Sequence, residues 1–410
     1  MMTKPGLALP NLANAHPVYT GSNSLSPFHE CYANRNTILR LAAGRFFVHY
    51  NGEDIQQAYW ALRNRAALFD VPERPLEISG PDVVEFLNRI FTRNSDKLKV
   101  GSGHYTLACT HQGGLFMDGI LFRLDDKKYW FVHPDGDLDT WFLAHKHNYN
   151  ISISDPKSRV LQLQGPKSLA VINLATNGGV DHRMGYFKAG FFTIGEQSVF
   201  ISRTGWTGEL GYEIYTLGQN TDYVRLWNEL ITSGKKYGMV FSSMQAMNIR
   251  RIEAGILDSG SDFDTSMAPD EAGLRRFVDR DKKYFIGYEA LKKRNTGNRI
   301  HGMLARSYTP KGGDFVHDGK NIVGYVTTGT YSPEFNAGIG YVRFNLAEDH
   351  IGNNYYIGNL DSSKHTCKII ALPFYDKNKK KPKMAKLDLQ ESITFDLSLI
   401  HISEPTRPGH

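Results

Sequence analysis

Cysteine is scarce in this 410-residue chain, and its cysteines are widely separated. Cys31, Cys109 and Cys367 are odd in number and form no CxxC pair, so the sequence indicates neither a disulfide framework nor a zinc site. Long apolar runs are also missing, since no stretch approaches the roughly 18 residues that cross a bilayer. The N-terminus lacks a signal-peptide pattern. These absences predict a cytoplasmic protein with no membrane partner and no bound metal.

Net positive charge is nearly absent outside the C-terminal end. The formal net charge is +6, and six lysines lie between Lys377 and Lys386, so the rest of the chain is close to neutral. A protein that binds nucleic acid through its folded part needs basic residues in that part. Nucleic acid is therefore not predicted as a partner.

The most distinctive stretch that is present is SRTGWTGELGYEIY, residues 202–215. Gly205, Gly208 and Gly211 recur there every three residues. Glycines let a backbone turn sharply and approach a flat ligand, because no Cβ stands in the way. The GxxGxxG spacing differs from that of nucleotide-binding motifs, and no Lys-Ser or Lys-Thr follows it. From the residues alone, the stretch predicts a glycine-rich β-hairpin with Trp206 exposed.

A strand followed by Gly-Pro and a helix is predicted twice. Leu76–Ser79 has the pattern of a strand, and the following Gly80-Pro81 leads into a helix whose first turn tolerates proline. The same order returns 85 residues later, beginning at Leu161 in LQLQGPKSLAVINL. The length of the chain predicts two or three domains. The repeated pattern predicts that two of them are related α/β units.

Periodicity predicts the remaining elements. Helical spacing of apolar residues predicts three helices, within 56–68, 222–231 and 242–255. Alternating apolar residues on both sides of His111–Gly114 predict a hairpin across His104–Leu124. From about Asn298 onward, short strands and frequent glycines predict a small β-domain.

RTGWTGELGYEIY resembles RTGYTGEDGFE, the signature of the aminomethyltransferase (glycine-cleavage T-protein) family of tetrahydrofolate-dependent one-carbon transferases. Further segments are similar to other parts of that family, namely ALFDV at 67–71, FIGYEAL at 285–291, VGYVTTGTYSPEF at 323–335 and LPFYD at 372–376. The resemblance implies an α+β fold with a T-protein-like arrangement of three domains. Two α/β units would surround a folate cavity, followed by a small C-terminal β-barrel.

Four segments are expected from this resemblance. They are an N-terminal arm at 1–45, a folate-binding region at 46–297, the barrel at 298–376, and a solvated basic tail at 377–410. The last thirteen residues, from Ser398, resemble translated read-through at an assembly edge and are excluded from the fold prediction.

The resemblance also implies the catalytic residue and the main folate contact. Glu213 matches the glutamate with which the family binds the pterin, whose N–H and NH₂ one carboxylate can accept together. Asp118 matches the second acid of a GGxxDD region beside the reactive folate nitrogen, and Met117 replaces the first. A carboxylate there can take a proton or stabilise developing positive charge, so Asp118 is the predicted catalytic residue.

Other contacts are implied in the same way. Tyr105 matches a position that lines the folate pocket, and Trp206 could stack on a ring or face a cationic donor, so both are predicted to bind substrate. The further predicted contacts to the folate cofactor are Tyr129, Arg251 and Glu209.

The predicted function is transfer of a methyl or aminomethyl group from a small methylated onium or amine compound to tetrahydrofolate. HPDGDL from His133, Trp206, Asn248 and SPEF from Ser332 are similar to dimethylsulfoniopropionate demethylase, a relative on the same scaffold. TGE and the Arg-Thr pair of the signature instead resemble the aminomethyltransferases. The alternative is thus an aminomethyltransferase of the glycine cleavage system, with a lipoyl carrier protein as partner.

A third hypothesis is a protein of another class, namely a non-catalytic folate-binding assembly factor. Such relatives carry KGCYxGQE, whereas this chain has KKYFIGYE at 282–289, without the Cys and the Gln. An enzyme is therefore predicted.

Overall fold

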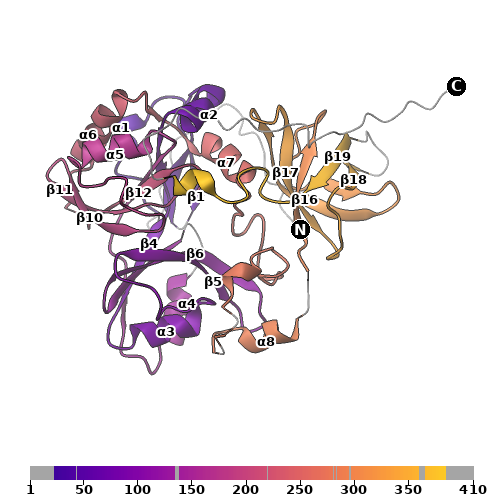
Figure 1. Ribbon diagram of the computed structural model, residues 1–410, viewed down its shortest axis with the longest axis horizontal. Helices are drawn as coiled ribbons and strands as arrows, with labels where there is room; N and C mark the ends of the chain where they lie inside the picture. The colour runs from indigo at the N-terminus through magenta and orange to yellow at the C-terminus, as the bar shows by residue number, and fades with distance from the viewer. Residues whose placement is uncertain are drawn as a thin grey trace.

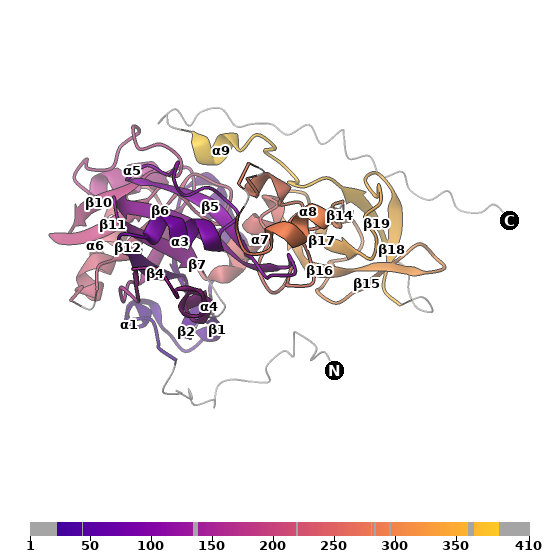
Figure 2. The same cartoon turned by 90° about the horizontal axis from the view of Figure 1, so that it is seen from below.

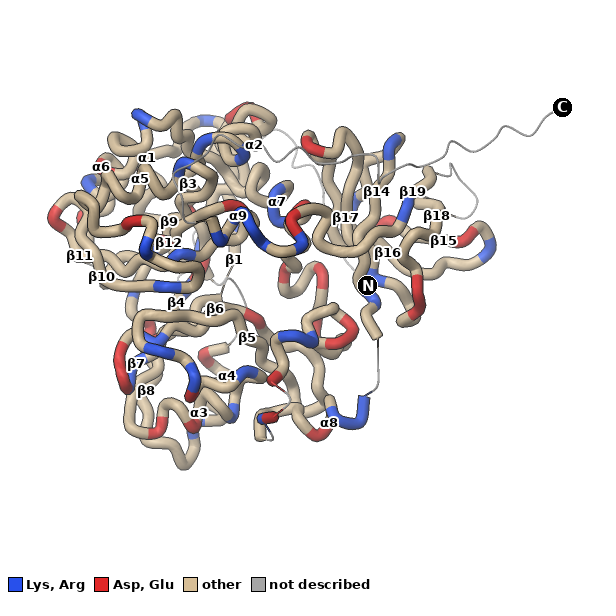
Figure 3. The backbone as a smooth tube through the Cα atoms, in the orientation of Figure 1, with Lys and Arg blue, Asp and Glu red and all other residues tan. Residues whose placement is uncertain are grey.

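The computed structural model describes residues 23–384, apart from 43, 134–137, 219, 280, 283, 295–296 and 360–364. Two lobes each contain a sheet and the third is a closed barrel (Figure 1), as the predicted α+β arrangement requires. Most of HPDGDL and all of the chain end from Ser398 lie outside the described residues. Within the described residues, no helix has the length and apolar character needed to cross a bilayer. Acidic and basic residues are interspersed over all three lobes (Figure 3).

The first sheet contains six strands, and β13 is paired in parallel with β3. In spatial order the strands are β10 (Ala189–Ile194), β11 (Gln197–Ser202), β12 (Gly211–Thr216), β9 (Val160–Gln164), β3 (Ala67–Val71) and β13 (Val240–Phe241). Helices α5 (Ser168–Ala175) and α6 (Tyr223–Lys235) pack their apolar side chains against this sheet. The hairpin predicted around the glycine-rich stretch is formed by β11 and β12.

The second sheet is inserted between β3 and β9 of the first. Its five strands, in spatial order, are β5 (Ser102–Cys109), β6 (Leu115–Asp125), β7 (Lys128–His133), β4 (Arg74–Ser79) and β8 (Ser152–Ser154). Helices α3 (Val83–Ile90) and α4 (Leu138–His145) cover one face. Phe122 and Trp130 on the other face pack against Phe200 and Tyr215 of the first sheet. The two sheets are thus interleaved in the chain and share a core.

The repeated strand–Gly-Pro–helix pattern is confirmed, since β4 leads into α3 and β9 leads into α5. Gly80 has φ 134° and Gly165 has φ 116°, which side chains rarely adopt. A Cβ would lie 2.5 Å from the Asn150 carbonyl oxygen at Gly80, and 2.7 Å from that of Arg65 at Gly165. Both turns therefore require glycine for the same reason.

The C-terminal lobe is the predicted β-domain, closed into a barrel. Its strands, in spatial order, are β14 (Ile300–Ala305), β17 (Ala337–Phe344), β16 (Ile322–Ser332), β15 (Phe315–His317), β18 (Asn354–Ile357) and β19 (His365–Ile370). A short helix η2 (Arg275–Phe277) and α8 (Tyr288–Lys293) lie in the segment that leads to it. Helix α7 (Met244–Glu253) contacts β16 and β17 of the barrel and also α2 (Ile55–Asn64).

One predicted helix is shorter than expected. The apolar spacing in 56–68 predicts a helix to Leu68, but α2 ends at Asn64 and Ala67 begins β3. Ala67 and Leu68 are fully buried between neighbouring strands, so sheet pairing overrides the helical spacing there.

The predicted N-terminal arm is corrected in its described part. Phe28 is fully buried in the core of the first sheet, and Tyr32 in α1 (His29–Tyr32) donates to Asp70 Oδ2 at 2.8 Å. Strands β1 (Ile38–Ala42) and β2 (Arg45–Tyr50) then form a separate hairpin. The described residues from Phe28 to Arg45 therefore belong to the folded body.

The predicted basic tail is corrected as well. Arg203 donates to the carbonyl oxygens of Pro382, at 3.1 Å, and of Met384. These residues form or follow α9 (Lys380–Lys383), which lies over the body (Figure 2). Lys381 Nζ lies 3.7 Å from Glu209 Oε1. The start of the lysine run is thus held by charged groups of the folded protein rather than solvated throughout.

The first turn of α2 provides a stability prediction. Asp54 Oδ1 accepts hydrogen bonds from the backbone N–H groups of Gln56 and Gln57, at 2.9 and 3.2 Å. Asp54→Ala removes this cap and is expected to lower the free energy of unfolding by about 1 kcal/mol. Urea unfolding monitored by circular dichroism measures it, with Asp54→Asn as the capping control. Equal midpoints for Asp54→Ala and the wild type would contradict the role of the cap.

Candidate functional site

A cavity of about 1130 Å³ opens where the two sheets, α7 and the barrel meet. Five of the residues predicted from the sequence line it, namely Tyr105, Asp118, Trp206, Glu213 and Arg251. Ligand pockets for small molecules commonly measure about 300–1,000 Å³, so this cavity has room for a pterin and the groups attached to it. The structure therefore brings residues from distant parts of the chain to the wall of one cavity.

Asp118 faces the cavity from β6. Tyr105 on β5 donates its hydroxyl to Asp118 Oδ2 at 2.7 Å, which fixes the orientation of the carboxyl group. Burial raises the pKa of Asp118 to about 6, and Asp258 adds to this while the Tyr105 hydrogen bond opposes it. The next residue back, Met117, points to the core of the second sheet and is 2% exposed. Side chains alternate between the two faces of a strand, so Asp118 faces the cavity while Met117 faces the core.

Glu213 faces the same cavity from β12. Its Oε2 accepts hydrogen bonds from the hydroxyls of Thr204 and Tyr215, both at 2.6 Å. Its Oε1 accepts from Gln162 Nε2 at 3.1 Å. Burial raises the pKa of Glu213, while the hydroxyl donors act against that rise. Because a carboxylate oxygen can accept two hydrogen bonds, Oε1 keeps capacity for one ligand donor.

Arg251 holds the cavity wall together. Its guanidinium pairs with Asp262 and lies 5.2 Å from the centre of the Trp206 ring. Its Nε also donates to Asn248 Oδ1 at 2.9 Å. The aspartate lies outside α7, in the segment that follows it. Arg251 therefore positions Trp206 and Asn248, both of which line the cavity.

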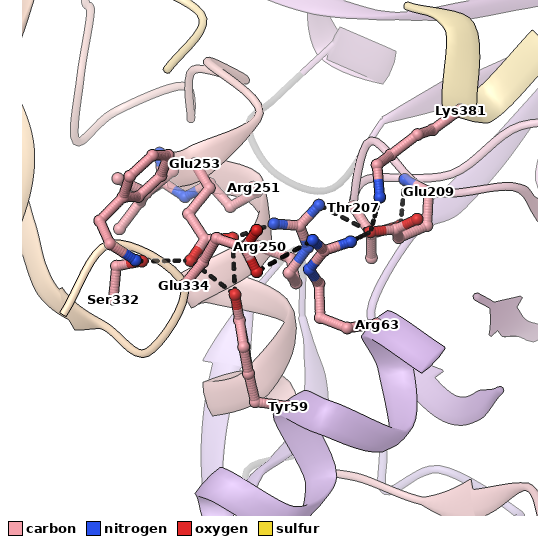
Figure 4. Close-up of polar contacts among 12 residues, drawn as sticks. Tyr59, Arg63, Thr207, Glu209, Arg250, Arg251, Glu253, Ser332, Glu334 and Lys381 are labelled. Carbon is pink, nitrogen blue, oxygen red and sulfur yellow. Dashed lines mark hydrogen bonds and ion pairs between the residues drawn. The ribbon is translucent and has the colours of Figure 1, made fainter. Parts of the chain in front are cut away.

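Glu209 does not reach the cavity, which corrects its prediction as a folate contact. It is 5% exposed, and its Oε1 lies 2.7 Å from both Arg63 and Arg250 (Figure 4). Burial alone would raise the pKa of Glu209, but Arg250, Lys381 and Arg63 outweigh it and hold the pKa below its ordinary value. Glu209 is thus part of a buried ion cluster between α2, α7 and the glycine-rich loop.

Tyr129 is also outside the cavity, so its prediction is corrected too. Tyr129 and Phe131 alternate along β7 with Trp130 and Val132, and they point toward α3 and α4. The Arg123 guanidinium lies 5.6 Å from the centre of the Tyr129 ring. Val132, on the opposite face of the strand, is the residue that lines the cavity.

The three signature glycines serve packing more than ligand approach. A Cβ at Gly205 would lie 2.1 Å from Gln164 Oε1, and one at Gly211 would lie 2.2 Å from the same atom. Gly208 has φ 68°, and a Cβ there would lie 2.5 Å from that of Ala254. Of the three, Gly205 reaches the large cavity. Close packing therefore explains these glycines, since Gly205 and Gly211 leave room for the Gln164 side chain and Gly208 for Ala254.

Glu73 and Gln162 are among the cavity residues that the sequence did not predict. Glu73 follows β3 and Gln162 lies in β9, and Gln162 Nε2 donates to Glu73 Oε1 at 2.8 Å. Gln162 is completely buried in a strand whose five residues are all buried. A glutamine inside such a strand was the available signal, because a buried amide needs partners.

Comparison with known proteins agrees with this fold. Residues 37–282 match the GCVT N-terminal domain, and residues 299–376 match the glycine cleavage T-protein C-terminal barrel domain. Together they define a folate-dependent one-carbon transferase. The chain belongs to the glycine cleavage T-protein family of aminomethyltransferases.

Several curated relatives are similar over most of their length. An aminomethyltransferase of Caldanaerobacter subterraneus subsp. tengcongensis is 30% identical over 368 residues, covering 87% of this chain and 97% of the relative. One of Thermoanaerobacter pseudethanolicus is 31% identical over 357 residues, covering 81% and 96%. The crystal structure of the glycine cleavage system aminomethyltransferase T from Bartonella henselae shares the fold, with a TM-score of 0.77 at 24% identity over 86% of this chain and 98% of that one.

Proposed function

We propose that this enzyme transfers a one-carbon unit from an aminomethyl group to tetrahydrofolate, with a lipoyl carrier protein as donor. The observation that carries the proposal is that Asp118 and Glu213 line one cavity. The aminomethyltransferase relatives support the alternative drawn from the sequence, and they lend no support to the preference for a dimethylsulfoniopropionate-demethylase-like activity. A cytoplasmic location stays a prediction.

The polar atoms of the cavity fit a reduced pterin. Among the described residues, Glu73 Oε2 and Gln162 Oε1 are buried without a hydrogen-bond partner, and Glu213 Oε1 has one protein donor. A pterin offers N–H and NH₂ groups along one edge, which the Glu213 and Gln162 oxygens can accept. When bound, the folate supplies the nitrogen that receives the one-carbon unit. Glu213 and its neighbours would hold the ring edge, and Tyr105 and Asp118 would lie at the reacting side.

Asp118 acts by charge and by proton transfer. With a pKa of about 6, its carboxyl group is mostly ionised at pH 7. In a site that excludes water, a fixed carboxylate stabilises positive charge more strongly than it does in solution. Tyr105 holds the carboxylate in one orientation, so little reorganisation is needed during the reaction.

Folate binding provides the first test. Glu213→Gln replaces a charged acceptor with an amide, and we expect tetrahydrofolate affinity to fall about tenfold or more, since charge-assisted hydrogen bonds are worth roughly twice neutral ones. Isothermal titration calorimetry measures the affinity. Glu85→Gln on the exposed face of α3 is the control. Unchanged affinity in Glu213→Gln would remove this residue from the folate site.

The donor is tested separately. The protein is incubated with tetrahydrofolate and either an aminomethylated lipoyl carrier protein or a panel of small methylated amines and onium compounds. Formation of 5,10-methylene-tetrahydrofolate only with the carrier is the expected result. Formation of 5-methyl-tetrahydrofolate with a small donor would support demethylation instead. Trp206 favours that second candidate, since an aromatic face attracts cations, although Arg251 already covers one face.

A further inference from the structure

Glu73 and Gln162 form a polar pair on the cavity wall beside Glu213. Gln162 Nε2 donates to Glu73 Oε1 at 2.8 Å and to Glu213 Oε1 at 3.1 Å, so one amide group connects two carboxyl groups. All three side chains line the cavity. They come from the β3–β4 connection, β9 and β12, which places the pair at the centre of the first sheet.

Two oxygen atoms of this pair have no hydrogen-bond partner in the part of the chain that the structure describes. Glu73 Oε2 and Gln162 Oε1 are both buried, and neither accepts nor donates a hydrogen bond among the described residues. Gln162 is itself fully buried. Buried polar atoms are nearly always paired with protein, water or ligand. Because these two border the cavity, they point to ligand groups as their partners.

The protonation of Glu73 decides what the pair can recognise. The charged groups around it are Glu213 and Tyr215 on β12, Asp70 on β3, and Arg45 on β2, whose guanidinium donates to the Glu73 carbonyl oxygen at 2.8 Å. Burial, followed by the nearby Glu213, raises the pKa of Glu73 to about 8, and Arg45 only partly opposes this. At pH 7 the Glu73 carboxyl group therefore carries a proton. Its free oxygen then serves as a donor beside the Gln162 acceptor.

We propose that Glu73 and Gln162 form a second recognition element of the site, which binds a ligand edge that presents a hydrogen-bond acceptor beside a donor. The aminopyrimidine ring of tetrahydrofolate has such an edge next to the groups that a carboxylate accepts. Glu213 and the pair would then bind adjacent parts of one ring. This assignment rests on the proposed function.

The test is the pH dependence of tetrahydrofolate binding to the full chain between pH 6.5 and 9.5. The wild type is expected to bind with constant affinity below pH 7 and to lose about tenfold per pH unit above the pKa of Glu73, because binding requires the proton. Glu73→Gln keeps a neutral donor and should bind with little pH dependence. Glu73→Leu removes the polar atoms and should bind weakly at every pH.

Unfolding of the ligand-free protein gives a second readout. An acid whose pKa is raised by folding binds more protons in the folded state, so its contribution to stability falls as pH rises from the unfolded value of 4.5 toward 8. Glu73→Gln lacks this loss, and its stability relative to the wild type should increase across that window and then level off. Glu85→Gln is the control for a surface charge.

The outcomes separate this assignment from the proposed function. Wild-type protein that fails to bind tetrahydrofolate at any pH would overturn both. Wild-type binding with the same pH profile in Glu73→Gln, or with undiminished affinity in Glu73→Leu, would overturn the Glu73–Gln162 element alone. A flat profile in Glu73→Gln together with weak binding in Glu73→Leu would support it.

Discussion

Asp118→Asn is expected to lower kcat by about 10²- to 10⁴-fold, the range that a positioned acid–base group contributes. Asparagine keeps the size of the side chain and can still accept the Tyr105 hydrogen bond of 2.7 Å. It cannot carry negative charge or take a proton. Tetrahydrofolate affinity should change little, because Glu213 and its neighbours provide the ring contacts. Steady-state kinetics at saturating folate measure the effect, and full turnover would end the assignment of Asp118.

The pH profile gives an independent check on Asp118. Burial raises the pKa of Asp118 to about 6, so wild-type kcat should fall as the pH drops through that value and the carboxylate becomes protonated. The residual activity of Asp118→Asn should lack this decline. Asp126→Asn is a matched control, because Asp126 lies on the same hairpin with its side chain 90% exposed. A decline at low pH that persists in Asp118→Asn would assign it to another group.

The parts of the site that the sequence predicts well are those carried by single strands. Asp118 on β6 and Glu213 on β12 each follow from a motif whose residues are contiguous, and alternation along a strand then fixes which side chains share a face. The two strands belong to different sheets, and both residues still line one cavity. The resemblance to the family predicted that Asp118 and Glu213 lie at one cavity. Alternation alone does not say which faces of the two sheets meet.

The residues that were misplaced depend on distant partners. Glu209 and Glu213 lie four residues apart in one signature, and either could have faced the ligand. Arg63 on α2 and Arg250 on α7 decide the matter, since they draw Glu209 into an ion cluster. The Lys381 contact also depends on a distant partner. The run of lysines alone predicts a solvated tail, whereas in the structure Lys381 lies beside Glu209. No local pattern contains such information.

Glu73 and Gln162 were missed for a related reason. Each has an ordinary local context, one between two strands and one within a buried strand. Their relation appears only when β9 lies between β3 and β12, which brings the Gln162 amide within hydrogen-bond distance of both Glu73 and Glu213. Polar residues in buried strands therefore deserve more weight in such sequences than periodicity gives them.

Arg250→Met is expected to lower the free energy of unfolding by about 3–5 kcal/mol, the cost of removing one partner from a buried ion cluster. Arg250 is fully buried and pairs with Glu209 at 2.7 Å and with Glu253 on its own helix (Figure 4). Methionine fills part of the space but leaves Glu253 without its cation. Tyr59 still donates to Glu253 Oε1 at 2.9 Å, so the loss is partial. Urea unfolding measures the change.

A surface pair provides the comparison for Arg250. Arg225 lies 2.7 Å from Glu196, but the two side chains are 46% and 82% exposed. Arg225→Met should therefore cost about 0–1 kcal/mol, as exposed ion pairs do. Arg250→Met combined with Glu253→Gln removes the uncompensated charge as well as the cation, and it should be more stable than Arg250→Met alone. If Arg250→Met unfolds at the same urea concentration as Arg225→Met, the buried cluster does not hold α7 against the glycine-rich loop.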